Sequence, residues 1–147
     1  MPLFYESLKE LVTTLNIQTN QQVVIYSVNI PILNANDVLT ITSTFECTNN
    51  YKYNAQIGSY IVLATLPNSI NGTRIDPANA WNITPGMHHG VVVKARSYKV
   101  YTQMFNSYIN VVGYSSADAA KPGQTLTVEQ GYGHLDVVVH GPQPPAF

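Results

Sequence analysis

The residues best suited to bind a metal ion are four histidines. His88 and His89 are adjacent, and His134 and His140 lie near the C-terminal end of the chain. Imidazole nitrogens are common ligands of zinc and other transition metals. Adjacent side chains of a strand point to opposite faces, so only one of the first two could join a given site. No carboxylate or cysteine stands at ligand spacing beside them. We therefore predict no metal site and no cofactor.

Cys47 is the only cysteine, so an internal disulfide is excluded. A thiolate nucleophile needs a neighbouring base or positive charge that lowers its pKa. Cys47 instead shares the parity of Leu39, Ile41 and Phe45 in an alternating segment, which predicts a core position. The chain lacks a Gly-x-Ser-x-Gly elbow, a phosphate-binding glycine loop, a zincin motif and the His-x-His of a cupin metal site. We predict that the protein is not an enzyme, and a cupin-like or cysteine enzyme is the least favoured alternative.

The acidic residues are dispersed rather than paired for acid–base catalysis, and Asp37, Asp76 and Asp118 fall in turn sequences. A turn aspartate usually bonds its own backbone. The stretch 66–86 has many turn residues and weak alternation, so we expect a long surface excursion with a short strand near 80–84. Aromatic rings there could stack on sugars. A glycan site in the region 66–90 is therefore an alternative function, with the candidate residues Asp76, Trp81 and His88.

Most of the chain alternates between apolar and polar residues with a period of two, and it is rich in β-branched and aromatic side chains. Turn sequences such as Asn49-Asn50 and Lys121-Pro122-Gly123 separate the runs. Strands are expected at 22–32, 37–48, 53–66, 90–101, 107–115, 124–131 and 134–140, with Gly131-Tyr132-Gly133 as a turn. Regularly spaced strands without intervening helices predict an all-β fold, an antiparallel jelly-roll sandwich.

The N-terminal residues 3–15 show helical rather than strand spacing of their apolar side chains, which predicts a short amphipathic helix. Three turns of helix are marginal alone, so the apolar stripe must contact the domain or another chain. The proline-rich end is expected to be an extended arm or a flexible end. We predict an N-terminal attachment segment at 1–20, a jelly-roll domain at 21–140 and a C-terminal tail at 141–147. The residues of the stripe are Phe4, Leu8, Leu11, Val12 and Leu15.

Charged residues make up only 10% of the 147 residues, and the net charge is −1. An ordinary soluble domain has roughly 25% charged residues. The scattered basic residues exclude the electrostatic footprint of a nucleic-acid-binding protein, and the short apolar runs exclude a bilayer-spanning helix. The N-terminus also lacks the pattern of a secretory signal. Low charge is typical of chains whose surfaces are covered by partners.

The chain has ten tyrosines, and these side chains are well suited to such contacts, because an aromatic ring with a polar hydroxyl fits a protein interface. Many of them lie in or beside the expected strands. We predict subunit contacts at Tyr98, Tyr101, Tyr108, Tyr114 and Tyr132.

The order of elements resembles the jelly rolls of the tumour-necrosis-factor and complement-C1q type. The resemblance covers Gln21 to His140 and rests on the alternating strands and on the segments 108–114 and 126–135. The chain is also similar to small, low-charge β proteins of tailed bacteriophages at Asn49-Asn50 and in 83–90. The resemblance implies a homotrimer on the capsid surface of a virion. It would bind a major capsid protein through its N-terminal segment and decorate or cement an icosahedral head.

Overall fold

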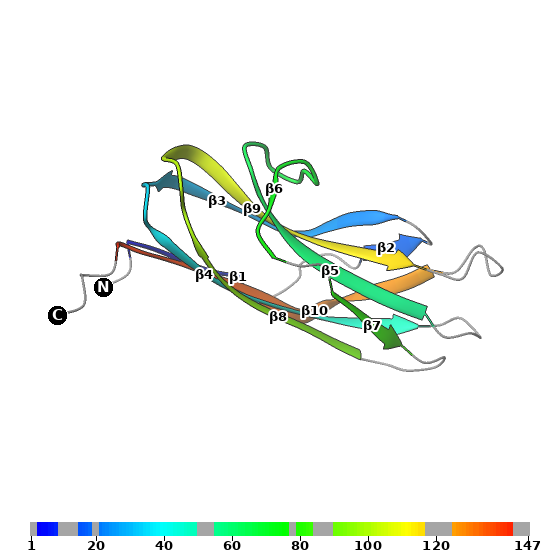
Figure 1. Ribbon diagram of the computed structural model, residues 1–147. Coiled ribbons are helices and arrows are strands. Elements are labelled where there is room, and N and C mark those ends of the chain that lie inside the picture. Colours follow the sequence, from blue (N-terminus) through cyan, green and yellow to red (C-terminus); the bar gives the residue numbers. More distant parts are fainter. Residues whose placement is uncertain are drawn as a thin grey trace.

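The computed structural model describes residues 3–8, 15–18, 21–49, 55–76, 79–83, 90–116 and 125–142. This part of the chain forms ten strands in two antiparallel sheets that pack face to face (Figure 1). No helix that could cross a membrane occurs in it.

Sheet A contains the N-terminal and C-terminal strands. Its members are β1 (Phe4–Leu8), β2 (Leu15–Gln18), β4 (Val38–Asn49), β8 (Gly90–Lys99) and β10 (Thr125–His140). Both β1 and β2 pair with β10, β1 along its second half and β2 along its first, so together they form one interrupted edge strand. β10 then pairs with β4, and β4 pairs with β8 at the other edge.

Sheet B has the same plan. Its members are β3 (Gln22–Leu33), β5 (Ala55–Ala64), β6 (Thr73–Arg74), β7 (Asn79–Ile83) and β9 (Met104–Ser116). β3 forms one edge and pairs with β9, which pairs with β5. β6 and β7 both pair with the free side of β5 and form the second interrupted edge.

When each interrupted edge is counted as one strand, the sandwich has eight strand positions, four in each sheet. The chain changes sheet at every connection between these positions except the one from β5 to β6. This alternation between two antiparallel sheets is a jelly-roll-like arrangement, and the predicted fold class is confirmed in this respect.

The predicted N-terminal helix is wrong where the structure describes the segment. Phe4–Leu8 and Leu15–Gln18 are strands, and residues 9–14 lie outside the described part. Five residues of β1 stand in register with β10, and Phe4 packs against the core. A short helix is marginal by itself, whereas pairing with β10 satisfies the backbone groups and covers that strand's edge. Tertiary pairing therefore overrides the local apolar spacing.

The core lies between the sheets and follows the predicted parity of β4. Leu39, Ile41, Phe45 and Cys47 are almost fully buried, while Thr40 is exposed on the opposite face. The predicted core position of Cys47 is confirmed. Inward residues of the other strands complete the core, including Ile57, Ile61, Ile109, Val111, Leu126, Leu135, Val137 and Val139.

A second apolar cluster lies on the outer face of sheet B. It consists of Tyr60, Val62, Ala64 and Val112, all buried. The connection after β5 folds back over this face, because Asn110 Nδ2 donates hydrogen bonds to the carbonyls of Leu66 (3.1 Å) and Ser69 (2.9 Å). The predicted surface excursion is thus present at 65–72, but the chain then returns to the sheet as β6 and β7.

β10 is one strand from Thr125 to His140, so the turn predicted at Gly131-Tyr132-Gly133 is wrong. The register against β4 shifts between Val128 and Gly133, which marks a bulge or irregularity at the predicted turn. The glycines therefore accommodate an irregular strand, because pairing with β4 resumes on both sides of them.

Tyr26 links the two sheets through the interior. Its hydroxyl donates a 2.8 Å hydrogen bond to the carbonyl of Thr44, which joins β3 of sheet B to β4 of sheet A. Burial raises the pKa of Tyr26 to about 12. An unfolded tyrosine loses its proton near pH 10, so the unfolded state binds fewer protons between these two values. The free energy of unfolding should therefore fall as the pH rises from about 10 to about 12.

Tyr26→Phe should remove this alkaline loss, which amounts to at most roughly 2–3 kcal/mol. The variant should be less stable than the wild type by about 1 kcal/mol near neutral pH, because the Thr44 carbonyl loses its donor. Urea unfolding at about pH 9 and about pH 11.5 measures the difference. Tyr5→Phe, which changes an exposed tyrosine outside the apolar rim, is the control. An equal alkaline loss in the wild type and Tyr26→Phe would contradict the prediction.

Candidate functional site: an assembly surface

The described residues contain no group of three or more histidine, cysteine, aspartate or glutamate side chains placed to hold a metal ion. Cys47 forms no disulfide within the described part of the chain, and none of its surface is exposed. His88 and His89 lie outside the described residues.

His134 makes the most catalytic-like arrangement in the described part. Its Nδ1 lies 3.1 Å from Thr44 Oγ1, and its Nε2 lies 3.3 Å from Asp136 Oδ2. His134 and Thr44 are register partners on β10 and β4, and the amide nitrogen of His134 also donates to Thr44 Oγ1 (3.2 Å). The Thr44 hydroxyl is therefore engaged by the neighbouring strand. We interpret the group as a cross-strand polar contact of sheet A.

Asp76 does not bond its own turn, contrary to the expectation for a turn aspartate. It lies between the sheets, where its Oδ1 accepts a 2.6 Å hydrogen bond from the amide of Ile61. Its Oδ2 contacts Lys94 Nζ, and only 2% of its side chain is exposed. At the break between β6 and β7, the carboxylate thus accepts the hydrogen bond of the Ile61 amide in place of a backbone carbonyl. Because its side chain is almost fully buried, it is not accessible to a sugar. Asp37 does behave as expected, because its Oδ2 accepts from the amide of Asn34 (2.8 Å).

The other two predicted glycan residues are less defined. Trp81 lies on β7 opposite Ile57, but its side chain is outside the described residues, as is all of His88. The described residues alone form no sugar-binding group, and the glycan site stays a prediction.

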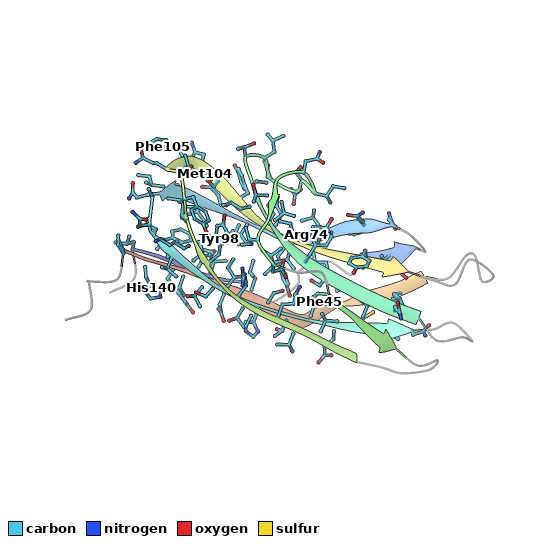
Figure 2. All side chains as sticks on the ribbon, in the orientation of Figure 1. Phe45, Arg74, Tyr98, Met104, Phe105 and His140 are labelled. Atoms are coloured by element: carbon cyan, nitrogen blue, oxygen red, sulfur yellow. The ribbon has the colours of Figure 1, made fainter. Side chains whose placement is uncertain are left out.

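A set of large exposed side chains marks one end of the sandwich. Figure 2 shows Met104 and Phe105 at this end, where β9 begins. The exposed residues come from the connections between β5 and β6 and between β8 and β9, and from the adjoining ends of β3 and β9. We call this set the apolar rim. Its members are Ile32 (52% exposed), Leu66 (63%), Ile70 (43%), Tyr101 (77%) and Phe105 (64%).

The direction of Phe105 follows from the backbone of the next residue. Asn106 has a φ of 52°, in the left-handed region that asparagine tolerates better than most residues. Along β9, Met104 packs against the core and Ser107 is buried, whereas Phe105 and its register partner Ile32 are exposed. Two apolar side chains consequently stand side by side in solvent. The sequence pattern does not predict this exposure, because the alternation of inward and outward side chains along β9 is interrupted at Asn106.

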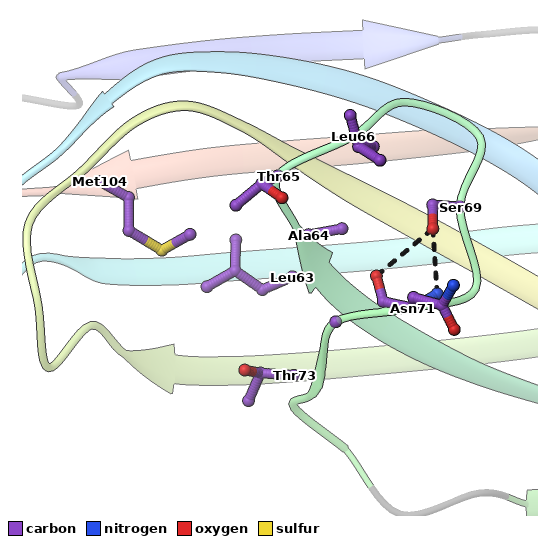
Figure 3. A pocket seen from close by; sticks show the side chains of 9 residues that line it. Leu63, Ala64, Thr65, Leu66, Ser69, Asn71, Thr73 and Met104 are labelled. Carbon is purple, nitrogen blue, oxygen red and sulfur yellow. Dashed lines mark hydrogen bonds between the residues drawn. The ribbon is translucent and has the colours of Figure 1, made fainter.

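A pocket of about 270 Å³ opens beside the rim (Figure 3). Met104 closes one side of it, and the connection after β5 forms the other, where Ser69 Oγ accepts a 3.0 Å hydrogen bond from the amide of Asn71. The lining is mainly small or apolar and includes Leu63, Ala64, Thr65, Leu66, Gly72 and Thr73. Such a surface offers shape and apolar contact rather than charge.

The predicted interface tyrosines have different surroundings. Tyr101 is exposed and stacks edge-on against Tyr98, with ring centroids 6.2 Å apart. Tyr114 lies over Gly58 on the outer face of sheet B, 6.0 Å from the ring of Tyr60. Tyr108 is half-buried on β9, and the side chain of Tyr132 is outside the described residues. Among the predicted tyrosines whose side chains the structure describes, Tyr101 is the most exposed.

The predicted attachment residues are spread over two strands and the segment between them. Phe4 is half-buried against the core, Leu8 and Leu15 lie on β1 and β2, and Leu11 and Val12 are outside the described residues. Among the side chains that the structure describes in this region, those of Leu3 and Tyr5 are exposed. Deleting residues 1–15 would remove part of an edge of sheet A, so such a truncation would not test attachment alone.

Comparisons with known proteins show similarity in structure. No protein-family model and no curated protein sequence matches the chain. The infectious bursal disease virus VP2 subviral particle is similar with a TM-score of 0.60 and 15% identity, over 94% of this chain and 33% of that one. T=1 particles derived from the same virus give a TM-score of 0.56 at 14% identity, over 94% and 32%. The Gt strain of infectious bursal disease virus gives 0.55 at 15% identity, over 97% and 34%.

At these identities the likeness shows the fold alone. This chain spans about one-third of the length of the VP2 chains that it resembles.

Proposed function

We propose that this chain is a structural protein of a virion, built as a jelly-roll subunit that assembles with copies of itself and with a shell. The observation that carries the proposal is the fold. The structural match covers 94% of this chain and one-third of a viral particle protein. The low charge and the exposed apolar rim support it, because both are typical of surfaces that partners cover.

The more specific form of the proposal is a homotrimer that decorates or cements an icosahedral phage head by binding its major capsid protein. The resemblance to trimeric jelly rolls motivates the stoichiometry. We place the contact between subunits at the apolar rim, with Tyr101 and Phe105 at its centre, since these are its most exposed aromatic residues. The lectin alternative is weakened, because Asp76 is buried.

Sedimentation of the purified protein tests this form of the proposal. The wild type should have three times the mass of the single chain, and Tyr101→Ser/Phe105→Ser should sediment as a monomer, because both changes remove aromatic area from the contact. Val93→Ser is the matched control. Val93 is 52% exposed on β8, away from the rim, so this variant should stay trimeric.

A monomeric wild type at every concentration tested would contradict the trimer, and a trimeric double variant would contradict the placement of the contact. Assembly of the wild type into closed shells, seen by electron microscopy, would replace the decoration role with a shell-forming one. Labelling of purified virions with an antibody against the protein tests the virion location directly.

A further inference from the structure

Lys94 and Asp76 bring an amine and a carboxyl group into contact inside the sandwich. Lys94 lies on β8, at the edge of sheet A, and Asp76 follows β6, at the edge of sheet B. Lys94 Nζ contacts Asp76 Oδ2, and only 7% and 2% of the two side chains are exposed. The two groups therefore meet where water is largely excluded.

Hydrogen bonds to the backbone hold both groups in place. Lys94 Nζ donates to the carbonyl of Ser59 at 2.9 Å, and the amide of Ile61 donates to Asp76 Oδ1 at 2.6 Å. The Ile61 amide withdraws electron density from the carboxyl group and can stabilise negative charge on Oδ1 when the carbon is attacked. Reacting groups positioned in this way can reach effective molarities on the order of 10⁵–10⁸ M.

Two buried hydroxyls accompany the pair. Ser43 is the register partner of Lys94 on β4, and Ser59 supplies the carbonyl that Nζ contacts. Both Oγ atoms are buried, and neither has a hydrogen-bond partner among the described residues. Buried hydroxyls normally have partners, so these two are available to relay protons next to the amine.

We propose that Lys94 and Asp76 condense into an intramolecular amide that cross-links the two sheets. A proton passes from Nζ to the carboxylate, the neutral amine attacks Cγ, and a bond forms between Nζ and Cγ. The bond between Cγ and Oδ2 breaks, and this oxygen leaves as water with the protons lost by Nζ. No oxidant or other reactant is needed. The neutral product removes two buried charges, whose desolvation is costly.

Such a bond would close the side of the sandwich where β8 faces the break between β6 and β7. Arg96 already bridges the same side, since its Nε donates a 2.6 Å hydrogen bond to the carbonyl of Ile75. The cross-link would convert a reversible contact between the sheet edges into a covalent one.

Mass spectrometry of a tryptic digest tests the proposal. Trypsin cuts after Arg74, Lys94 and Arg96, but an acylated Lys94 is not a substrate. The cross-linked protein should release one peptide, Ile75–Arg96, with a mass one water below that of its sequence. Asp76 is the only acidic residue in this peptide, and it precedes Pro77. Proline has no N–H, so Asp76 cannot lose water by forming a succinimide.

Two variants make the assignment specific. Lys94→Arg should yield peptides of full mass, because a guanidinium does not acylate under these conditions. Lys99→Arg changes an exposed lysine of the same strand and should retain the water loss. Complete cleavage at Lys94 in the denatured wild type, with peptides of full mass, would overturn the proposal. The wild-type digest decides the question even if Lys94→Arg does not fold.

Discussion

Lys94→Met is expected to lower the free energy of unfolding by about 3–5 kcal/mol, because it leaves the charge of Asp76 buried without its partner. Methionine occupies a similar volume but cannot donate a hydrogen bond. Asp76→Asn should also be destabilising, since it removes the carboxylate charge that the buried Lys94 ammonium contacts. The asparagine keeps an oxygen that can accept from the amide of Ile61, so the break between β6 and β7 is preserved. Equilibrium unfolding in urea measures both values.

The double variant Lys94→Met/Asp76→Asn separates the loss of the pair from damage to packing. It removes both charges of this contact, so it should be more stable than the sum of the single effects predicts, with a coupling of about 2–3 kcal/mol. Lys99→Met, at an exposed position of the same strand, should change the stability by less than about 0.5 kcal/mol. Additive single effects would contradict this account. A cross-link between the pair requires the Lys94 amine, so it would be lost in Lys94→Met and in the double variant.

Gly133→Ala is expected to destabilise the protein by about 3 kcal/mol, at the upper end of the usual cost of overpacking. An added Cβ would lie 2.5 Å from the carbonyl oxygen of Thr44 and 2.9 Å from the Cα of Phe45. Both atoms belong to the backbone of β4. Because β4 pairs with β10 both before and after the irregularity at Gly133, this part of its backbone cannot move away alone. The Cβ would also lie 2.5 Å from the Tyr26 hydroxyl. Thermal and urea unfolding should both show the loss.

Gly141→Ala is the matched control, because its nearest neighbour would be Leu3 Cδ1 at an ordinary contact distance of 3.8 Å. Adding Tyr26→Phe to Gly133→Ala should restore only part of the stability, since it removes the hydroxyl contact but not the two backbone contacts. Full recovery in that double variant would show that β4 adjusts to the methyl group. An unaffected Gly133→Ala variant would show the same.

The alternation of residue types by itself determined much of this protein. It predicted a two-sheet β fold, the two faces of β4 and the burial of Cys47, because successive strand side chains point to opposite sides whatever the partner strand. Turn residues located most strand ends to within two or three positions. The apolar rim was predicted only at Tyr101, since its other members lie where a turn, a connection or the left-handed Asn106 breaks the alternation.

The tertiary structure alone decided the features that depend on distant partners. Phe4–Leu8 is a strand because its backbone forms hydrogen bonds with β10. β10 continues through two glycines because β4 pairs with both of its halves. Asp76 is a buried acceptor because Ile61 and Lys94 meet it from β5 and β8. Local spacing carries no information about which segments become neighbours. These contacts join residues far apart in the chain, and their energies outweigh the small intrinsic preferences of short segments.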